Sequence, residues 1–394
     1  TTALAPATEL EARGIGENSN GGVIETSTLG NFIVQGTIDA SSESGTAGMW
    51  IHNAKDIRIV KTNDIEQGQP EEIFSPEINT ISNTLIENIL DRGTNITLDA
   101  GKINDIPEEG DIMQDVDAGI SFSGGNGDVT LSMNANNRIK LEGGIEASEA
   151  TNIPNVDLTA NVAEIYGDIN TNGGYFTSEN EETLLGANID TIGGNITVAG
   201  ATKILADIGL STGAGAGNIT FGGTLNGANN LTLAAGTGDI LLNEAVGGAN
   251  RIANLTVNSA NNVTAGTLNA NTFSQNAGTG TTTLNGAVNL TGDFGFTGNN
   301  LTLNNNLTTT AGKMTVTNAG VFTTAAAGDI NADGGFTQNG TGVSNLAGDI
   351  STNNNNINFA GQVTLSGPVD MNTGTDAGNI TFGGTLNGAN NLTL

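Results

Sequence analysis

The chain contains no cysteine and only one histidine in 394 residues. The lack of cysteine excludes a disulfide framework and any thiolate metal site, and it is compatible with export of the chain in an unfolded state. Aromatic residues make up 4% of the chain, and tryptophan occurs once. No apolar run reaches the roughly 18 residues of a membrane-spanning helix, so the sequence predicts none.

Basic residues are also scarce, because 11 Lys and Arg stand against 41 Asp and Glu, for a net charge of −30. A surface of this sign repels polyanions, so we expect no nucleic-acid partner. The charge is unevenly spread: 9 of the 11 basic and 33 of the 41 acidic residues precede Ile208. Composition therefore indicates an N-terminal module with insertions over 1–160 and a repeat region over 161–394.

A long internal repeat dominates the second region. The sequence GNITFGGTLNGANNLTL at 217–233 recurs unchanged at 378–394, a shift of 161 positions, and GDINTNGGY from Gly167 aligns at the same shift with GDINADGGF from Gly328. Self-similarity at a fixed period is typical of repeat architectures in which each unit buries its apolar face against its neighbours. The region is therefore one 161-residue repeat followed by an incomplete second copy.

Short strand-like words recur inside the long repeat. NITF at 218–221, LTL at 231–233 and MTV at 314–316 alternate apolar residues with Thr, which is the pattern of a strand with one buried face. Asn, Gly and Asp between the words favour tight turns. Strands this short need neighbouring coils to form a stable sheet. The sequence predicts a right-handed parallel β-helix, or β-solenoid, with coils of about 20 residues.

One segment of the N-terminal region has helical periodicity. In ISNTLIENILDRG, Ser82 or Asn83 is a candidate N-cap, Leu85, Ile86, Ile89 and Leu90 form an apolar stripe, and Gly93 suits a left-handed C-terminal position. We expect a short capping helix that covers one side of the solenoid near its start, since an open coil exposes unpaired backbone groups.

Three blocks of the N-terminal region carry a family resemblance: GTIDASSESGTAGMWIHNAKDIRIV from Gly36, ISNTLIENILDRGTNITLDAG from Ile81, and GDVTLSMNANNRIKLEGGIEA from Gly127. Their order resembles the part of filamentous haemagglutinin-like exoproteins that follows the secretion region, with Trp50 where that family has an aromatic residue. The downstream repeats are similar to those of very large bacterial surface proteins. The resemblance implies an extracellular or bacterial cell-surface location and an outer-membrane transporter as partner during export.

Few residues suggest catalysis. A lone imidazole, His52, has no second His or Cys with which to hold a metal, and we interpret it as a structural histidine. Some β-solenoids degrade acidic polysaccharides with clustered Asp and a basic residue, but the repeat region offers only Arg251 and Lys313 as bases. We therefore predict no enzyme and assign no catalytic, cofactor-binding or metal-binding residue.

Calcium is the one cofactor that any motif in the sequence suggests. GGNGDVTL from Gly124 approaches the calcium-binding nonapeptide of some solenoids, but its Asp comes one position early and the word is not repeated in tandem. Asp329, Asp333 and Asp349 are expected in turns one coil apart, where they would stack as an acidic ladder. The favoured interpretation is that these Asp side chains cap backbone NH groups without metal.

Asn-X-Thr words are frequent and fit the acceptor pattern for N-glycosylation. Stacked Asn side chains also hydrogen-bond along a ladder of coils, and we favour this second interpretation. The words begin at Asn95, Asn195, Asn218, Asn230, Asn254, Asn262, Asn289, Asn300, Asn306, Asn339, Asn379 and Asn391.

Three functions remain open from the sequence. The first is a non-catalytic, secreted surface protein that forms a stiff adhesive or structural rod or stalk. The second is a self-assembling subunit of an extracellular fibre or sheath, and the third is a polysaccharide-degrading β-helix enzyme. The first two predict as partners a host or neighbouring-cell surface, glycans, or copies of the chain itself.

Overall fold

The computed structural model describes residues 2–4, 8–28, 32–34, 36–62, 78–103, 106–107, 109–122, 127–147 and 152–394. It is a parallel β-solenoid of about 15 turns of about 22 residues each, with a single short helix in the described residues. The predicted fold class is confirmed, and the coils are slightly longer than the predicted 20 residues. The chain divides into two compact units, Thr1–Ala201 (unit 1) and Thr202–Leu394 (unit 2), which are described separately.

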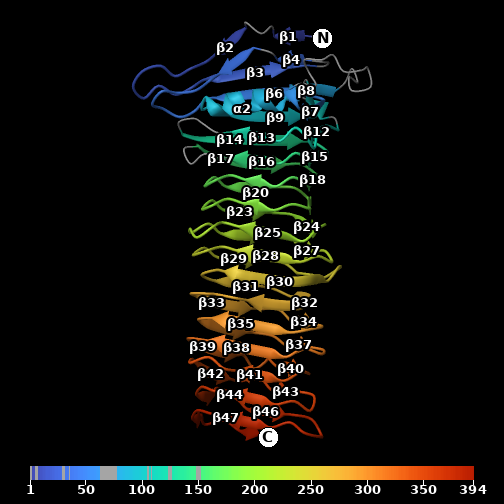
Figure 1. The fold of residues 1–394 in the computed structure, drawn as a ribbon, viewed down its shortest axis with the longest axis vertical. Helices are drawn as coiled ribbons and strands as arrows, with labels where there is room; N and C mark the ends of the chain where they lie inside the picture. Colours follow the sequence, from blue (N-terminus) through green and yellow to red (C-terminus); the bar gives the residue numbers. More distant parts are fainter. Residues whose placement is uncertain are drawn as a thin grey trace. The chain divides into compact units, whose positions relative to one another are not determined.

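Unit 1 consists of coils with three faces, which the chain visits in the order A, B, C (Figure 1). Strands on each face pair in parallel with the same face of the next coil. Face A contains β3 (Val23–Ser27), β6 (Met49–Ala54), β9 (Asn95–Ala100), β14 (Gly127–Ala135), β17 (Asn152–Thr159), β20 (Phe176–Ser178) and β23 (Ile196–Val198). Face B contains β8 (Ile78–Ser82), β7 (Asp56–Val60), β12 (Asp111–Gln114), β15 (Arg138–Leu141), β18 (Val162–Ile165) and β21 (Glu182–Leu185), and face C contains β13 (Ile120–Phe122), β16 (Ile145–Ala147), β19 (Ile169–Asn170) and β22 (Ile189–Asp190).

The first coils of unit 1 depart from this plan. The predicted helix is α2 (Asn83–Asp91), which follows β8 and precedes β9, so it occupies the part of the coil where later coils have a face C strand. Ser82 is its N-cap and accepts a hydrogen bond from the Leu85 N–H at 3.1 Å. Gly93, with φ of +82°, lies just beyond its C-terminus. Three short pairs complete this end: β1 (Thr2–Leu4) with β4 (Phe32–Val34), β2 (Glu9–Glu11) with β5 (Thr37–Asp39), and the antiparallel β10 (Lys102–Ile103) with β11 (Ile106–Pro107).

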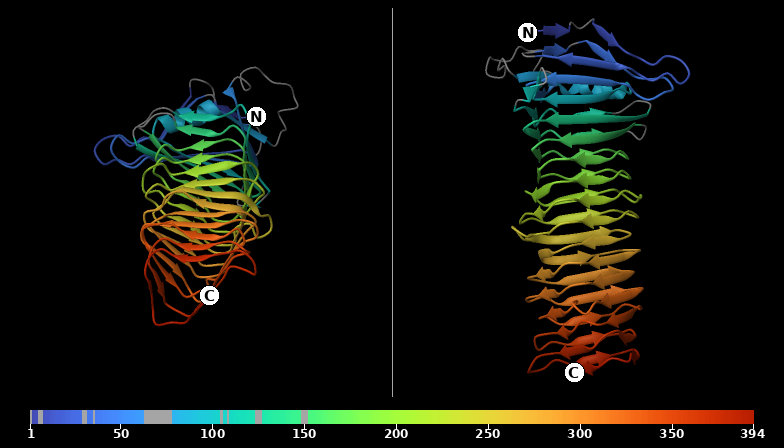
Figure 2. Two further views of the ribbon diagram at one scale, coloured as in Figure 1. Left: turned by 60° about the horizontal axis from the view of Figure 1, so that its bottom comes forward. Right: turned by 180° about the vertical axis from the view of Figure 1, so that it is seen from behind.

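Unit 2 repeats the three-face plan with fewer insertions (Figure 2). Face A contains β26 (Ile219–Phe221), β29 (Ile240–Leu242), β31 (Val263–Ala265), β33 (Thr281–Leu284), β36 (Asn300–Leu303), β39 (Val321–Thr324), β42 (Val343–Leu346), β45 (Val363–Leu365) and β48 (Leu386–Asn387). Face B contains β24 (Ala201–Ile204), β27 (Leu225–Asn226), β34 (Val288–Leu290), β37 (Leu307–Thr309), β40 (Ile330–Ala332), β43 (Ile350–Ser351), β46 (Val369–Asn372) and β49 (Leu392–Thr393). Face C contains β25 (Ile208–Ser211), β28 (Leu231–Ala234), β30 (Ile252–Ser259), β32 (Leu268–Gln275), whose start lies on face B, β35 (Phe294–Gly298), β38 (Met314–Asn318), β41 (Phe336–Gln338), β44 (Ile357–Phe359) and β47 (Ile380–Phe382).

The core of each unit lies inside the coils and is built from stacked identical positions. Leu231 is fully buried and pairs in register with Ile208 of the preceding coil and Leu255 of the following one. Aromatic rings stack in the same way, with the centroids of Phe273 and Phe294 5.0 Å apart. Because the side-chain period is two, the Thr between two buried apolar residues faces outward, as the sequence predicted.

Candidate functional surfaces

His52 lies inside unit 1, on the buried side of β6. Its Nδ1 is 2.7 Å from Thr26 Oγ1, and the same hydroxyl accepts a hydrogen bond from Trp50 Nε1 at 3.0 Å. Burial lowers the pKa of His52 to about 4, from an ordinary value of 6.5, because the protonated ring would lose its hydration. The imidazole is therefore neutral near pH 7 and is part of the core, in agreement with the interpretation of a structural histidine.

Many Asn and Asp side chains just before, at or near the first residue of a strand form vertical series that we call the turn columns. In each contact, the side-chain Oδ1 accepts a hydrogen bond from a backbone N–H one coil further along. Asn218 Oδ1 accepts from the Asp239 N–H at 2.8 Å, and Asp239 Oδ1 accepts in turn from the Asn262 N–H at 2.9 Å. The same contact joins Asn95 to Thr130, Asn155 to Tyr175, Asp168 to Asn188, Asn262 to Thr281, Asp293 to Lys313, Asn300 to Val321 and Asn356 to Asn379.

The turn columns confirm the ladder interpretation for several Asn-X-Thr words, among them those at Asn95, Asn218, Asn262 and Asn300. Their side-chain oxygens satisfy backbone donors that would otherwise lie unpaired at the strand ends. Elsewhere the Asn side chains pair with each other, as Asn254 Nδ2 does when it donates to Asn230 Oδ1 at 2.6 Å. Glycosylation of these words stays a prediction.

The expected stack of three aspartates is only partly correct. Asp329 Oδ1 accepts from the Asp349 N–H at 2.9 Å, and Asp349 Oδ1 accepts from the Asp370 N–H at 2.8 Å, so these side chains cap backbone groups as predicted. Asp333 does not belong to this column, because it follows β40 whereas Asp329 precedes it. The sequence words alone do not distinguish the two corners of one coil. In the calcium-like word, Gly124 to Asn126 lie outside the described residues.

The two bases of the repeat region lie in unit 2 before face C strands. The guanidinium of Arg251 donates to the carbonyl oxygens of Ala270 at 2.9 Å and Asn289 at 2.6 Å, so it holds the backbone of two further coils. Lys313 enters a turn column through its backbone N–H. Within the described ranges, no group of three or more His, Asp or Glu side chains is placed to hold a metal ion.

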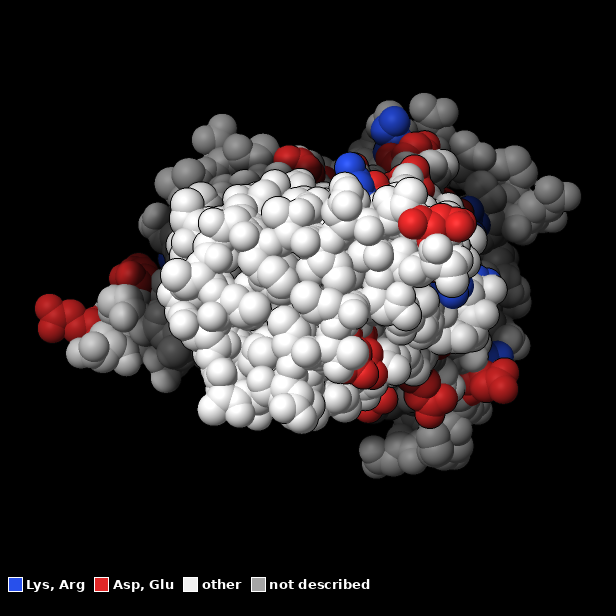
Figure 3. All heavy atoms as spheres, turned by 90° about the horizontal axis from the view of Figure 1, so that it is seen from below, with Lys and Arg blue, Asp and Glu red and all other residues white. Residues whose placement is uncertain are grey.

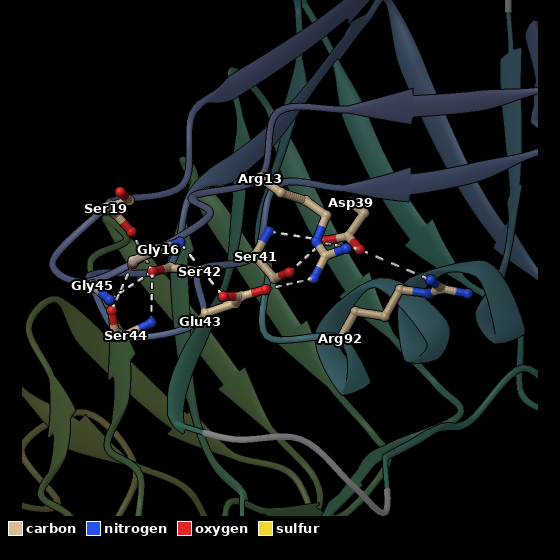
Figure 4. A network of polar contacts seen from close by, with 10 residues as sticks. All are labelled: Arg13, Gly16, Ser19, Asp39, Ser41, Ser42, Glu43, Ser44, Gly45 and Arg92. Carbon is tan, nitrogen blue, oxygen red and sulfur yellow. Dashed lines mark hydrogen bonds and ion pairs between the residues drawn. The ribbon is translucent and has the colours of Figure 1, made fainter.

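Two loops project together from the start of unit 1, and we call them the double loop (13–22 and 40–48; blue in Figures 1 and 2). Figure 4 shows that Asp39 lies between Arg13 and Arg92, with N–O distances of 3.5 and 3.9 Å. Ser42 links the two loops, because its Oγ donates to the Ser19 carbonyl at 2.5 Å and accepts from the Gly45 N–H at 2.6 Å. Asp39 is buried, but the Arg13 and Arg92 side chains are exposed to solvent, so each ion pair contributes little stability, and the contacts fix the shape of the loops.

A polar groove crosses the outer surface of face A in unit 1, with a volume of about 300 Å³. Thr97, Ser132, Asp157 and Thr177 occupy one outward row, each in register with the next across β9, β14, β17 and β20. The second row contains Asn134, Thr159 and Glu179, and the buried Leu158 forms part of the floor. The groove therefore combines hydroxyl, amide and carboxylate groups on four consecutive strands.

Asp157 is the central charged residue of the groove. Its Oδ2 accepts a hydrogen bond from the Tyr175 hydroxyl at 3.0 Å. Burial raises the pKa of Asp157 above its ordinary value, and the nearby charge of Glu179 acts in the same direction, whereas the hydrogen bond from Tyr175 opposes the shift. Burial and the contact with Asp157 likewise raise the pKa of Tyr175. Tyr175 therefore stays protonated and holds the carboxylate in one orientation.

The sequence did not predict this groove. Its residues come from coils that are separated by insertions of unequal length, so that Trp50 pairs with Ile96 and Ile96 with Leu131. No fixed period brings Thr97, Ser132 and Asp157 into one row. The only available signal was the outward Thr, Ser or Asp between two apolar residues of each strand word.

Unit 2 carries few charges, and residues 378–394 carry none. Figure 3, which looks onto the last coil, shows an uncharged central surface with Lys, Arg, Asp and Glu only toward its rim. No helix in the described part of the chain is long and apolar enough to cross a membrane. No protein-family model matches the sequence, and no curated protein matches it.

Proposed function

We propose that the chain is a non-catalytic structural or adhesive segment of a secreted cell-surface protein, with its coils forming a stiff rod or stalk. The observation that carries this proposal is that the Asn and Asp side chains of the turn columns form hydrogen bonds between stacked coils. In both units the Asn and Asp residues at the turns accept hydrogen bonds from the next coil, as Asn95 does in unit 1 and Asn218 in unit 2. The side chains of these residues accept hydrogen bonds from backbone N–H groups and do not converge on a site where a substrate could react.

The locations and contacts of the candidate catalytic groups His52 and Arg251 support the same proposal. His52 is a neutral member of the core, and Arg251 caps carbonyl groups. A general base needs to reach a substrate proton, which a fully buried imidazole does not. The two groups also lie in different units.

We further propose that the chain belongs with filamentous haemagglutinin-like exoproteins exported through an outer-membrane transporter. The proposal rests on the block order noted in the sequence, together with a solenoid whose single helix among the described residues, α2, lies in the second of those blocks. The absence of cysteine is compatible with passage through a transporter in an unfolded state.

The test is surface exposure on the cells that make the protein. An antibody against unit 2 should label intact, unpermeabilised cells, and external protease should remove the signal while a cytosolic marker stays intact. Labelling that requires permeabilisation would contradict the surface location. A cytosolic enzyme of similar size serves as the control for cell integrity.

The alternative is a self-assembling fibre subunit, which the low charge of unit 2 favours. Residues 208–394 carry only 8 acidic and 2 basic side chains, against 33 acidic and 9 basic in residues 1–207, so contacts between copies through unit 2 would meet less ionic repulsion than contacts through unit 1. This alternative predicts that the purified chain forms filaments with a regular axial repeat in a concentration-dependent manner.

A further inference from the structure

We propose that the polar groove of unit 1 binds an uncharged oligosaccharide, a ligand assignment that rests on the proposed adhesive function. The groove is lined by side chains that donate and accept hydrogen bonds, on the outer surface of β9, β14, β17 and β20. Sugar hydroxyls are both donors and acceptors, and carboxylates are strong acceptors for them. Asp157 and Glu179 supply acceptors, while Thr97, Ser132 and Thr177 supply hydroxyl groups, each of which is both a donor and an acceptor.

The charge of the groove selects against other ligands. Its lining contains no Lys, Arg or His, and it contains the carboxylates of Asp157 and Glu179. An anionic polysaccharide or a nucleic acid would therefore meet repulsion without a compensating cation. A divalent metal is not favoured either, because the described residues hold no suitable ligand group.

The backbone of the groove selects against a peptide that would bind as an added strand. Such binding requires a free sheet edge. β14 pairs with β9 on one side and with β17 on the other, and β17 pairs with β20, so these strands have no unpaired edge at the groove. Recognition must therefore use side chains, which suits a ligand rich in hydroxyl groups.

The groove is rigid and periodic. β14 and β17 pair over eight consecutive residues, from Gly127 with Asn152 to Asn134 with Thr159. Tyr175 fixes the central carboxylate of Asp157 through a 3.0 Å hydrogen bond. Pre-organised groups on strands reduce the ordering cost of binding. Adjacent strands lie about 4.8 Å apart, a repeat comparable with the length of one sugar ring, so a chain of sugars that crosses the strands meets a similar group at each step.

Unit 2 provides an internal comparison. The corresponding outward positions of β31, β33 and β36 are Thr264, Thr283 and Thr302, which pair in register and include no carboxylate. The row in the groove of unit 1, in contrast, combines the carboxylate of Asp157 with the hydroxyl groups of its neighbours. A substitution on face A of unit 2 is therefore a matched control for one in the groove.

The test is calorimetric titration of the full chain with cellohexaose, maltohexaose and chitohexaose. At least one should bind with a Kd below about 1 mM, and Thr177→Trp, which fills the groove, should weaken that binding at least ~10-fold. Thr220→Trp is the control, since β26 has the same buried–outward–buried pattern as β20, and it should leave the Kd within about twofold. Asp157→Asn retains the shape of the side chain but removes its charge, and should weaken binding several-fold. Unchanged circular dichroism would show that each variant folds.

Three results would overturn the proposal: no binding of any of the three oligosaccharides, unchanged binding by Thr177→Trp, or tighter binding of polygalacturonate in the same groove. These outcomes differ from a failure of the proposed function. Cleavage of a bound hexasaccharide, detected by mass spectrometry, would contradict a non-catalytic role and leave the binding site in place. Absence of binding by a surface-exposed chain would remove the site and leave the structural role.

Discussion

At the scale of single residues, the structure assigns definite roles to side chains that look ambiguous in the sequence. The single histidine is a core residue beside the single tryptophan, with ring centroids 5.5 Å apart. A buried neutral imidazole makes folding sensitive to acid, because the unfolded chain takes up a proton that the folded chain rejects. Trp50 offers a fluorescent probe of this same region.

The first prediction concerns the pH dependence of stability near His52. Its pKa is 6.5 when exposed and about 4 in the folded chain. The contribution of His52 to the free energy of unfolding should therefore be complete above pH 6.5 and decrease as the pH falls from 6.5 toward 4. Below pH 4 this group should cause no further change. The loss amounts to about 3 kcal/mol. Urea denaturation followed by Trp50 fluorescence at about pH 7 and about pH 4.5 measures the greater part of this loss, about 2 kcal/mol.

The His52→Gln variant is the control for that prediction, because carboxylates also titrate in this range. The variant should be less stable at neutral pH but should lose less stability between the two pH values than the wild type. An equal loss in both proteins would show that His52 does not cause the acid sensitivity.

The second prediction concerns a strained turn in unit 1. Ile192 has φ of +48°, a left-handed conformation that is costly for a β-branched residue, whereas the equivalent turn one coil earlier has Asn172 at φ of +47°. Ile192 is half exposed, so its side chain contributes little to the core. Ile192→Asn should raise the unfolding free energy by about 1 kcal/mol, measured by urea denaturation.

The reciprocal variant Asn172→Ile should lower stability by a similar amount. If Ile192→Asn were destabilising, the exposed isoleucine would have to make a favourable contact that outweighs its backbone strain.

At the scale of elements, most strands of unit 2 have two to four residues and are held by contacts between coils. A short strand such as β26 buries only two apolar side chains, Ile219 and Phe221, and the turn columns supply further hydrogen bonds between coils. Neither contribution is available to an isolated coil. Stability should therefore depend on nearest neighbours, as in other repeat arrays.

The third prediction concerns the turn columns. Asn300 Oδ1 accepts from the Val321 N–H at 2.8 Å. Asn300→Ala should leave this donor without its acceptor, cost about 1 kcal/mol, and speed hydrogen exchange at the Val321 amide. Asn300→Asp keeps the acceptor oxygen and should preserve the slow exchange. Equal exchange in the wild type and the Ala variant would mean that the column does not stabilise the coil.

The fourth prediction compares two adjacent residues of β28. Leu231 is fully buried, whereas Thr232 faces outward. Leu231→Asp should cost more than about 4 kcal/mol, because it buries an unpaired charge, and should open the coils that contribute Ile208 and Leu255. Limited proteolysis should cut the variant within these coils. Thr232→Asp should remain as resistant as the wild type, and equal resistance of both variants would contradict the register.

At the scale of the whole molecule, periodicity was sufficient to predict the fold class. The apolar-Thr-apolar words predicted strands with one buried face, and α2 was predicted from Ser82 to Gly93 because its capping and apolar stripe are local signals. The coil length was less exact, since register steps vary: Leu255 pairs with Phe273, 18 positions on, and Leu231 pairs with Leu255, 24 positions on. The predicted coil length was a mean spacing between a few strand-like sequences, and that mean did not include the coils with longer turns.

The groove and the Asp333 position illustrate what periodicity does not predict. Both depend on which corner of a coil a polar residue occupies, and that is set by the lengths of the intervening turns. Thr97 and Ser132 are 35 positions apart but are adjacent in the sheet. Only the paired register of the strands reveals such neighbours. The net charge of −30, in contrast, is independent of register, and the expectation that it disfavours polyanionic partners stays a prediction.

Electron microscopy of the native material that contains this chain tests the proposed function most directly. We expect separate projections from the cell surface that bind an antibody against unit 2, because the coils stack on one another within the chain and the Asn and Asp side chains of the turn columns bond to neighbouring coils. Continuous filaments with a regular axial repeat, labelled along their length, would contradict the stalk and make the chain a fibre subunit.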